Sequence, residues 1–233
     1  MSPTSSILYQ AKALSFDYRL DQQTVHALDQ VDLEIKRGEL LLIMGPSGSG
    51  KSTLLNLLGL IEPLQAGSLL FNGLDLRQQN EKKLNELRRF KIGFVFQSFL
   101  LFDVLTAAEN VEYFLVRQGI ERKERQKRVQ EALRMVELEA QASQRPQQMS
   151  GGQRQRVAIA RALAKRPEVI IADEPTASLD QKTSRDILQI LRTLANDGVT
   201  VIMASHDSLV RDYATRQLHI ADGKIIEGGS HAL

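Results

Sequence analysis

A glycine-rich loop around position 50 constrains this chain more than any other part of its sequence. An apolar run at 40–44 indicates a short buried strand before the loop, and a leucine-rich helix follows it. This order predicts a P-loop, in which backbone N–H groups and a helix N-terminus surround phosphate. A glycine-rich turn without a ligand is the alternative, which this context disfavours. The residues expected to bind nucleotide phosphate are Gly45, Pro46, Ser47, Gly48, Ser49, Gly50, Lys51, Ser52 and Thr53.

Two carboxylates after residues 169–172 supply the chemistry that this loop lacks. That apolar run indicates a core strand, so Asp173 and Glu174 emerge at its carboxyl end, where parallel sheets bind ligands. Lys51 is expected to reach the outer phosphates of ATP, while Ser52 and Asp173 hold Mg²⁺. Glu174 is expected to act as a base, or to position the water that attacks the γ-phosphate. The alternative is that the two carboxylates only cap a turn.

Two more polar residues follow apolar strands. We expect His206 to hydrogen-bond the γ-phosphate and Gln97 to sense Mg²⁺ or the attacking water, which gives both a place among the catalytic residues. Taken singly, each also fits a plainer interpretation, namely a surface histidine and a structural glutamine at a strand end.

A second helix begins with two glycines, although glycine disfavours helix formation. The sequence at this point is Ser150, Gly151, Gly152 and Gln153, and the close approach of an anion to the backbone explains it. Because the P-loop already provides one phosphate cradle, we expect this second site to serve the nucleotide of another copy, paired head to tail. A serine N-cap followed by an ordinary glycine loop is the alternative.

Composition removes several classes of function. The 30 lysine and arginine residues against 28 aspartate and glutamate residues leave a net charge of +2, so no nucleic-acid partner is expected. The absence of cysteine excludes disulfides, thiol catalysis and cysteine-bound zinc. Residues 1–6 lack a basic segment followed by an apolar core, and no apolar run approaches the ~20 residues of a membrane span. We therefore expect a soluble chain that meets a membrane only through a partner.

The pattern along the chain predicts an α/β fold. Alternation over about 7–35 predicts antiparallel strands, and an amphipathic segment at 184–194 between later strands indicates a parallel sheet with crossover helices. A helical insertion, broken by Pro146, separates the two parts, and a hairpin turn is expected at Asp222 and Gly223. The expected strands are 40–44, 68–71, 92–96, 169–172 and 200–205, and the expected helices of the insertion are 107–117, 123–138 and 153–164.

Together these motifs resemble those of the ATP-binding cassette (ABC) ATPases over essentially the whole chain. The resemblance implies a P-loop ABC ATPase core with an antiparallel β subdomain and an α-helical subdomain. Residues 1–233 would then form a single domain, with 1–97 and 165–233 as the nucleotide-binding core and 98–164 as the helical subdomain that carries the signature motif. It also implies roles, which are adenine stacking by Tyr18, a Q-loop at Gln97, the signature at 150–153, a D-loop at 178–180 and a switch histidine at His206.

Finer features, at 92–97 and 105–111, resemble the branch that contains the lipoprotein-release, macrolide-export and cell-division ATPases (LolD, MacB, FtsE). Phe102 and Asp103 stand where that branch commonly has Leu-Pro, and Met149 stands where leucine is usual. The resemblance implies an ATP-sandwich homodimer bound to integral membrane permease subunits on the cytoplasmic face of the membrane, and it leaves a periplasmic adaptor open. The alternatives are a non-transport ABC ATPase of cell division, DNA maintenance or translation, and a regulatory subunit without turnover.

An aromatic segment beside Gln97 is the expected contact for such a permease. Phe94 and Phe96 are expected in the core, whereas the apolar residues 99–102 are expected to form a groove for a cytoplasmic helix of the permease. A role of 99–102 in the core alone is the rival. The mixed charges at 121–128 indicate a solvated helix face.

Overall fold

The computed structural model describes residues 6–20 and 23–226, so most of the N-terminal segment expected to lack a leader lies outside the described residues. A six-stranded sheet with the order β10-β9-β3-β8-β7-β6 forms the centre of the molecule. Its strands are parallel except for β10, which closes a hairpin with β9 at the predicted turn. The strands are β3 (Leu40–Met44), β6 (Ile92–Phe96), β7 (Val169–Asp173), β8 (Thr200–Ala204), β9 (Arg216–Ala221) and β10 (Lys224–Ile226).

Apolar layers bury the middle of this sheet on both faces, which explains why β3, β7 and β8 are nearly continuous apolar runs. Leu40 and Leu42 of β3 face a core shared with helices, whereas Leu41 and Ile43 face a second core. The second core joins α1 (Lys51–Leu58) to a four-stranded antiparallel sheet of order β2-β1-β4-β5. That sheet consists of β1 (Ile7–Leu20), β2 (Gln23–Lys36), β4 (Ala66–Phe71) and β5 (Leu74–Asp75).

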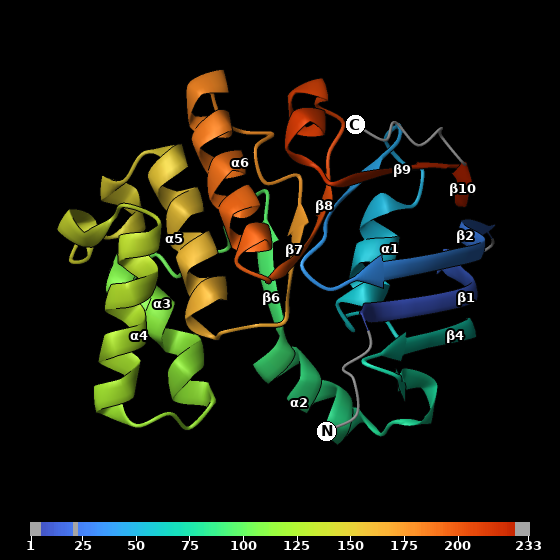
Figure 1. Ribbon diagram of the computed structural model, residues 1–233, viewed down its shortest axis with the longest axis horizontal. Helices are drawn as coiled ribbons and strands as arrows, with labels where there is room; N and C mark the ends of the chain where they lie inside the picture. Colours follow the sequence, from blue (N-terminus) through green and yellow to red (C-terminus); the bar gives the residue numbers. More distant parts are fainter. Residues whose placement is uncertain (1–5, 21–22, 227–233) are drawn as a thin grey trace.

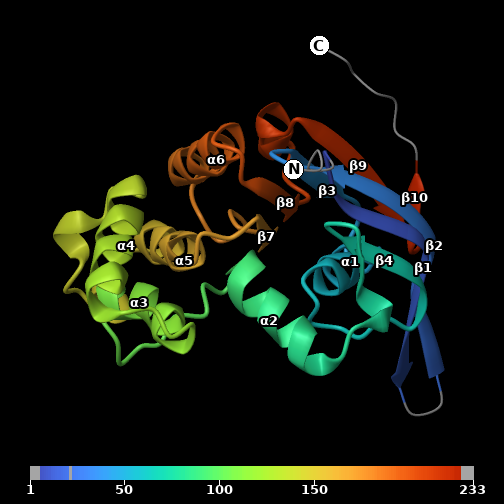
Figure 2. The same ribbon diagram turned by 60° about the horizontal axis from the view of Figure 1, so that its bottom comes forward.

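The helices α3, α4 and α5 gather on the side opposite the antiparallel sheet, as Figures 1 and 2 both show. They share the first core with α6, which packs on the parallel sheet. The predicted division at 98 and 164 stays a prediction. The helices are α2 (Glu81–Lys91), α3 (Ala107–Arg117), α4 (Arg122–Met135), α5 (Gly151–Ala164) and α6 (Gln181–Asn196), and the short 3₁₀ turns are Leu76–Gln78, Glu139–Gln141, Pro146–Gln148 and Ser208–Tyr213.

Most predicted elements are confirmed with small shifts at their ends, and three of the differences have a local explanation. The helix expected at 123–138 ends at Met135, because Glu137 adopts the left-handed backbone conformation, with φ +58°. The helix expected from 153 begins two residues earlier, because the Ser150 side chain caps it. Helix α2 was not predicted, although the side chain of Asn80 caps it and Leu87 on its inner face is buried.

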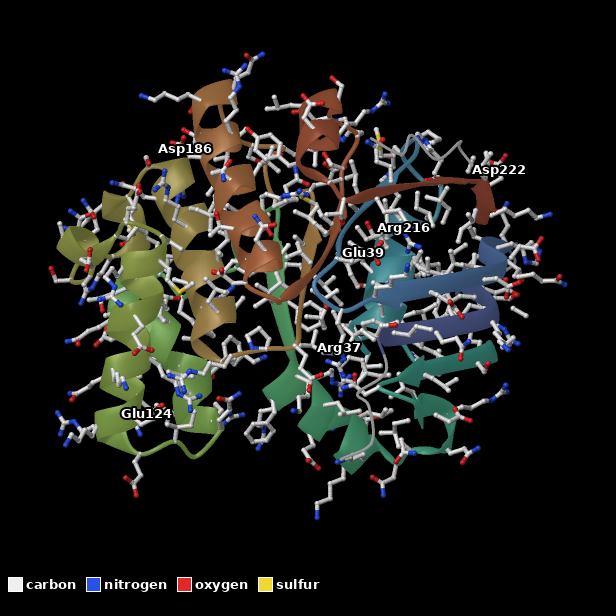
Figure 3. The ribbon with its side chains drawn as sticks, in the orientation of Figure 1. Arg37, Glu39, Glu124, Asp186, Arg216 and Asp222 are labelled. Carbon is white, nitrogen blue, oxygen red and sulfur yellow. The ribbon has the colours of Figure 1, made fainter. Side chains whose placement is uncertain are left out.

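An ion cluster fastens the antiparallel sheet to the amino-terminal end of β7. Glu168, just before β7, accepts hydrogen bonds from Arg37 at 2.9 Å and from Asn72 at 2.8 Å, and it pairs with Lys91 at 2.8 Å. Arg37, which is labelled in Figure 3, lies in the turn between β2 and β3. Burial opposes ionisation, but the hydrogen bonds from Lys91, Asn72 and Arg37 outweigh it and lower the pKa of Glu168 to about 2.

Within residues 6–20 and 23–226, no helix has the length and the apolar character needed to cross a membrane.

Candidate nucleotide-binding site

A cleft of about 780 Å³ lies at the carboxyl ends of β6, β7 and β8, beside the loop between β3 and α1. Parallel strands end at the same edge of the sheet, so residues far apart in the sequence meet there. The cleft brings together twelve of the predicted site residues, namely Tyr18, Pro46, Ser47, Gly48, Gly50, Lys51, Ser52, Thr53, Gln97, Asp173, Glu174 and His206.

The glycines of the loop allow the chain to pack closely against β2 and β9. A Cβ atom on Gly45 would lie 2.1 Å from the carbonyl oxygen of Ile220, and one on Gly50 would lie 2.4 Å from that of Ala27. Gly50 also has φ +105°, a conformation that glycine adopts without strain. Gly45 therefore packs against β9, on the side of the loop away from the cleft, and does not line the cleft.

Lys51 is nearly buried at the start of α1. Its Nζ donates hydrogen bonds to the carbonyl oxygens of Gly45 at 2.9 Å and Pro46 at 2.8 Å. The Oγ of Ser49 is buried without a hydrogen-bond partner among the described residues. Lys51 lines the cleft, whereas Ser49 does not, so of these two side chains the ammonium group of Lys51 is the one that faces an anion there.

Asp173 ends β7 beside α1. Burial raises its pKa, and the neighbouring Glu174 raises it further, whereas a hydrogen bond from Ser52 and the charge of Lys51 act in the opposite direction. A hydroxyl and a carboxylate are oxygen donors of the kind that Mg²⁺ accepts, so this pair fits the expected ion. Across the described part of the chain, no three or more His, Cys, Asp or Glu side chains cluster as metal ligands.

Glu174 has an unusual backbone and an incompletely bonded carboxylate. Its φ of +47° lies in the left-handed region, and its N–H donates to the carbonyl of Ala204 at 3.0 Å. Oε1 lies 2.8 Å from Nδ1 of His206, whose side chain is exposed. Oε2 is buried, with no hydrogen-bond partner in the described residues. One oxygen is therefore fixed by histidine, and the other remains able to accept a hydrogen bond.

Tyr18 lies at the other end of the cleft, on β1. Its ring packs edge-on against Phe16 with centroids 4.9 Å apart, and the partly exposed Val25 lies on the same wall. A supported aromatic ring beside an apolar side chain suits a stacked base. Sequence reasoning did not find Val25, Ala27 or Ala177, which also line the cleft. Small and apolar side chains of this kind carry no motif.

The glycine-initiated helix lies apart from this cleft. Ser150 caps α5 and forms a reciprocal capping box with Gln153. A Cβ atom on Gly152 would lie 2.3 Å from Cγ2 of Thr183, so close packing against α6 already requires this glycine. Ser150, Gly152 and Gln153 line a separate pocket of about 260 Å³, and among the described residues none of 150–153 lines the cleft.

A third hollow of about 680 Å³ lies between α2, α3, α5 and the segment after Gln97, and we call it the aromatic groove. Phe94 and Phe96, expected in the core, are only half-buried and stack on its wall with centroids 5.7 Å apart. Leu100 is 54% exposed and Phe102 is 39% exposed at its mouth. Phe94 still packs against the second core, so the expectation is partly confirmed for that residue. The core position expected for Phe96 was wrong, because β6 is the edge strand of the parallel sheet and Phe96 lies on the groove wall.

The strand, the glycine loop and the helix, facing two carboxylates at the carboxyl edge of a parallel sheet, define the class of P-loop ATPases. The chain belongs to the ABC transporter family, whose model matches residues 28–177. It is an ABC-type ATPase domain, so the predicted family, fold class and enzyme class are confirmed.

Relatives of known sequence support this placement. The uncharacterized ABC transporter ATP-binding protein MJ0796 of Methanocaldococcus jannaschii is 45% identical over 219 residues, which are 92% of this chain and 93% of that protein. The macrolide export ATP-binding/permease protein MacB of Marinobacter nauticus is 44% identical over 227 residues, which are 97% of this chain but 35% of that protein. The predicted branch, which includes the macrolide-export ATPases, is thereby supported.

A solved structure agrees with the fold. The dimeric post-hydrolysis state of the ATP-binding cassette MJ0796, bound to ADP and Pi, matches with a TM-score of 0.89 at 42% identity. The match covers 97% of this chain and 99% of that one.

Proposed function

We propose that this chain is the ATP-binding and ATP-hydrolysing subunit of a membrane transporter complex, and that Glu174 orients the attacking water. The carboxylate of Glu174 is the observation that carries the proposal. One of its oxygens lies 2.8 Å from His206, and the other is buried without a partner among the described residues, at the edge of the phosphate cleft. An acceptor held in this way suits a water in line with a γ-phosphate.

The other residues of the cleft take the roles that their chemistry supports. We propose that residues 45–53 bind the phosphates of ATP and that Tyr18 stacks on its adenine ring. Ser52, Gln97 and Asp173 would hold Mg²⁺, whose charge would stabilise the phosphate oxygens when it is bound with ATP. Lys51 would then exchange its two carbonyl partners for phosphate oxygens.

We propose that two copies close head to tail around two ATP. The separation of residues 150–153 from the cleft of their own chain supports this arrangement, because their helix N-terminus then remains available to the nucleotide of the other copy. The dimeric structures of MJ0796 give the arrangement a precedent in a relative.

We propose that residues 98–164 act as the helical subdomain and that the aromatic groove receives a cytoplasmic segment of a permease. MacB relatives, described as ATP-binding/permease proteins, are about three times as long as their match to this chain, which supports a permease partner. Such a partner would hold the chain at the cytoplasmic face of the membrane, and a periplasmic adaptor stays open.

The charges of the groove indicate which segment would fit. Five cations line it, and its lining includes no carboxylate among the described residues. Arg161 and Lys165 are mostly buried and donate hydrogen bonds to backbone carbonyls, and both lie over the ring of Phe114. Burial lowers the pKa of Lys165 to about 8. A segment with both apolar and acidic side chains would complement these cations.

The catalytic assignment is tested by Glu174→Gln. The amide keeps the size of the side chain and removes its charge, so we expect kcat to fall by about 100-fold or more, while affinity for ATP stays within about twofold. Steady-state phosphate release and equilibrium nucleotide binding measure the two quantities. Glu139→Gln, at an exposed glutamate outside the cleft, is the matched control. Hydrolysis by Glu174→Gln at the rate of the unmodified chain would refute the assignment.

A further inference from the structure

A buried glutamine on α5 joins this helix to the loop that carries Glu174. The side chain of Gln155 is fully buried, and its Nε2 donates a 2.7 Å hydrogen bond to the carbonyl oxygen of Pro175. Pro175 follows Glu174 directly, so this bond fixes the peptide group one residue beyond the carboxylate. The other amide atom, Oε1, is buried with no partner within the described residues. The contact to Pro175 is therefore the polar interaction that the structure gives this side chain.

The backbone of Glu174 depends on such support. A left-handed conformation is uncommon for residues other than glycine and persists where the surrounding structure enforces it. The N–H of Glu174 donates to Ala204, and its carbonyl accepts from the N–H of Ala177 at 3.3 Å. Gln155 adds a third bond, to the next carbonyl along the chain. These bonds hold the peptide groups on both sides of Glu174 and therefore set the direction of its carboxylate.

The first turn of α5 also packs directly on the segment that follows Glu174. A Cβ atom on Gly152 would lie 2.3 Å from Thr183, and one on Gly151 would lie 3.4 Å from Leu179. The backbone of α5 therefore approaches Thr183 too closely for a side chain at 152 and packs at ordinary contact distance on Leu179, and packed interiors transmit displacement. The amino-terminal turn of α5 and the segment 174–183 are thus mechanically one unit.

We propose that Gln155 is a positioning residue for hydrolysis, which transmits the position of the α5 N-terminus to Glu174 through the Pro175 carbonyl. This inference rests on the proposed function, in which that N-terminus contacts the nucleotide of the other copy. Closure of the dimer on one nucleotide would then adjust the carboxylate that serves the second nucleotide. Gln155 itself is buried and is not among the residues that line the cleft, so it would act through Glu174.

The test is Gln155→Met in the full chain, since methionine keeps the length of the side chain and removes the donor. We expect kcat to fall about tenfold, which corresponds to about 1.4 kcal/mol, while KM and the equilibrium affinity for ATP stay within about twofold. A change in kcat alone separates positioning from damage to the binding site. Gln130→Met, at an exposed glutamine on α4, should leave both constants unchanged.

A double variant makes the test specific to Glu174. In the Glu174→Gln background, Gln155→Met should lower the residual rate no further, because the carboxylate to be positioned is already gone. An unchanged kcat, parallel losses of kcat and ATP affinity, or a further tenfold loss in that background would overturn the inference.

Two controls keep these outcomes separable. If circular dichroism shows that Gln155→Met does not fold, Gln155→Leu, which also removes the donor but is shorter, is measured against the same expectations. A fully active Gln155→Met beside an inactive Glu174→Gln refutes this inference alone, whereas a fully active Glu174→Gln refutes the catalytic assignment.

Discussion

Replacing Glu168 by glutamine should loosen the attachment of the antiparallel sheet to the parallel sheet. The charge of Glu168 meets Arg37 of the β2–β3 turn, Asn72 of the β4–β5 turn and Lys91 at the end of α2, and these contacts lower its pKa from 4.5 to about 2. A shift of this size corresponds to about 3 kcal/mol at most. The side chain is 24% exposed, so solvent screening reduces the expected loss to about 1–2 kcal/mol.

The dependence on pH identifies the cause of the loss. A carboxylate whose pKa is lower in the folded state stabilises the fold above its unfolded pKa, and this contribution disappears as the pH falls towards the folded value. The unmodified chain and Glu168→Gln should therefore differ by a constant amount at pH 6–8 and converge between about pH 4.5 and pH 2.

Urea unfolding followed by circular dichroism measures both effects, and the melting temperature at pH 7 should fall by about 3–6 °C for a domain of this size. Glu139→Gln, at an exposed glutamate, is the control and should change neither quantity. Equal stability of Glu168→Gln and the unmodified chain at pH 7, or a difference that persists undiminished at pH 3, would refute the reasoning.

Two further predictions concern the assembly. Mixed dimers of a Lys51→Ala chain with a Ser150→Arg chain should hydrolyse ATP faster than dimers of either variant alone, because one of the two composite sites stays intact. Unless hydrolysis strictly requires both sites, the absence of any recovery in confirmed mixed dimers would contradict the shared site. Leu100→Asp, at an exposed position of the aromatic groove, should release the chain from its membrane complex with little change in melting temperature, whereas Met135→Asp on α4 should not. A large fall in melting temperature for Leu100→Asp would instead assign that residue to the core.

Several features of this chain are encoded locally, and the sequence predicted them for that reason. The P-loop, the Ser150 cap and the strand at 92–96 each depend on a short contiguous run whose backbone preference is set by its own residues. The continuous apolar runs of β3 and β7 likewise indicated burial on both faces before any contact was known. Parallel pairing then placed Asp173 and His206 at the same edge, as expected.

Other features depend on pairs of residues far apart in the chain, and only the tertiary structure decided them. Phe94 and Phe96 have the composition of core residues, but the position of β6 at the edge of the sheet leaves both half-buried on a groove wall, where Phe94 also packs against the second core. Gln155 looks like any polar helix residue until the fold places the Pro175 carbonyl 2.7 Å from its amide. Glu168 acquires its partners from residues 37, 72 and 91 in the same way. Local preferences specify which elements form, whereas burial and pairing across the fold specify what each polar side chain meets.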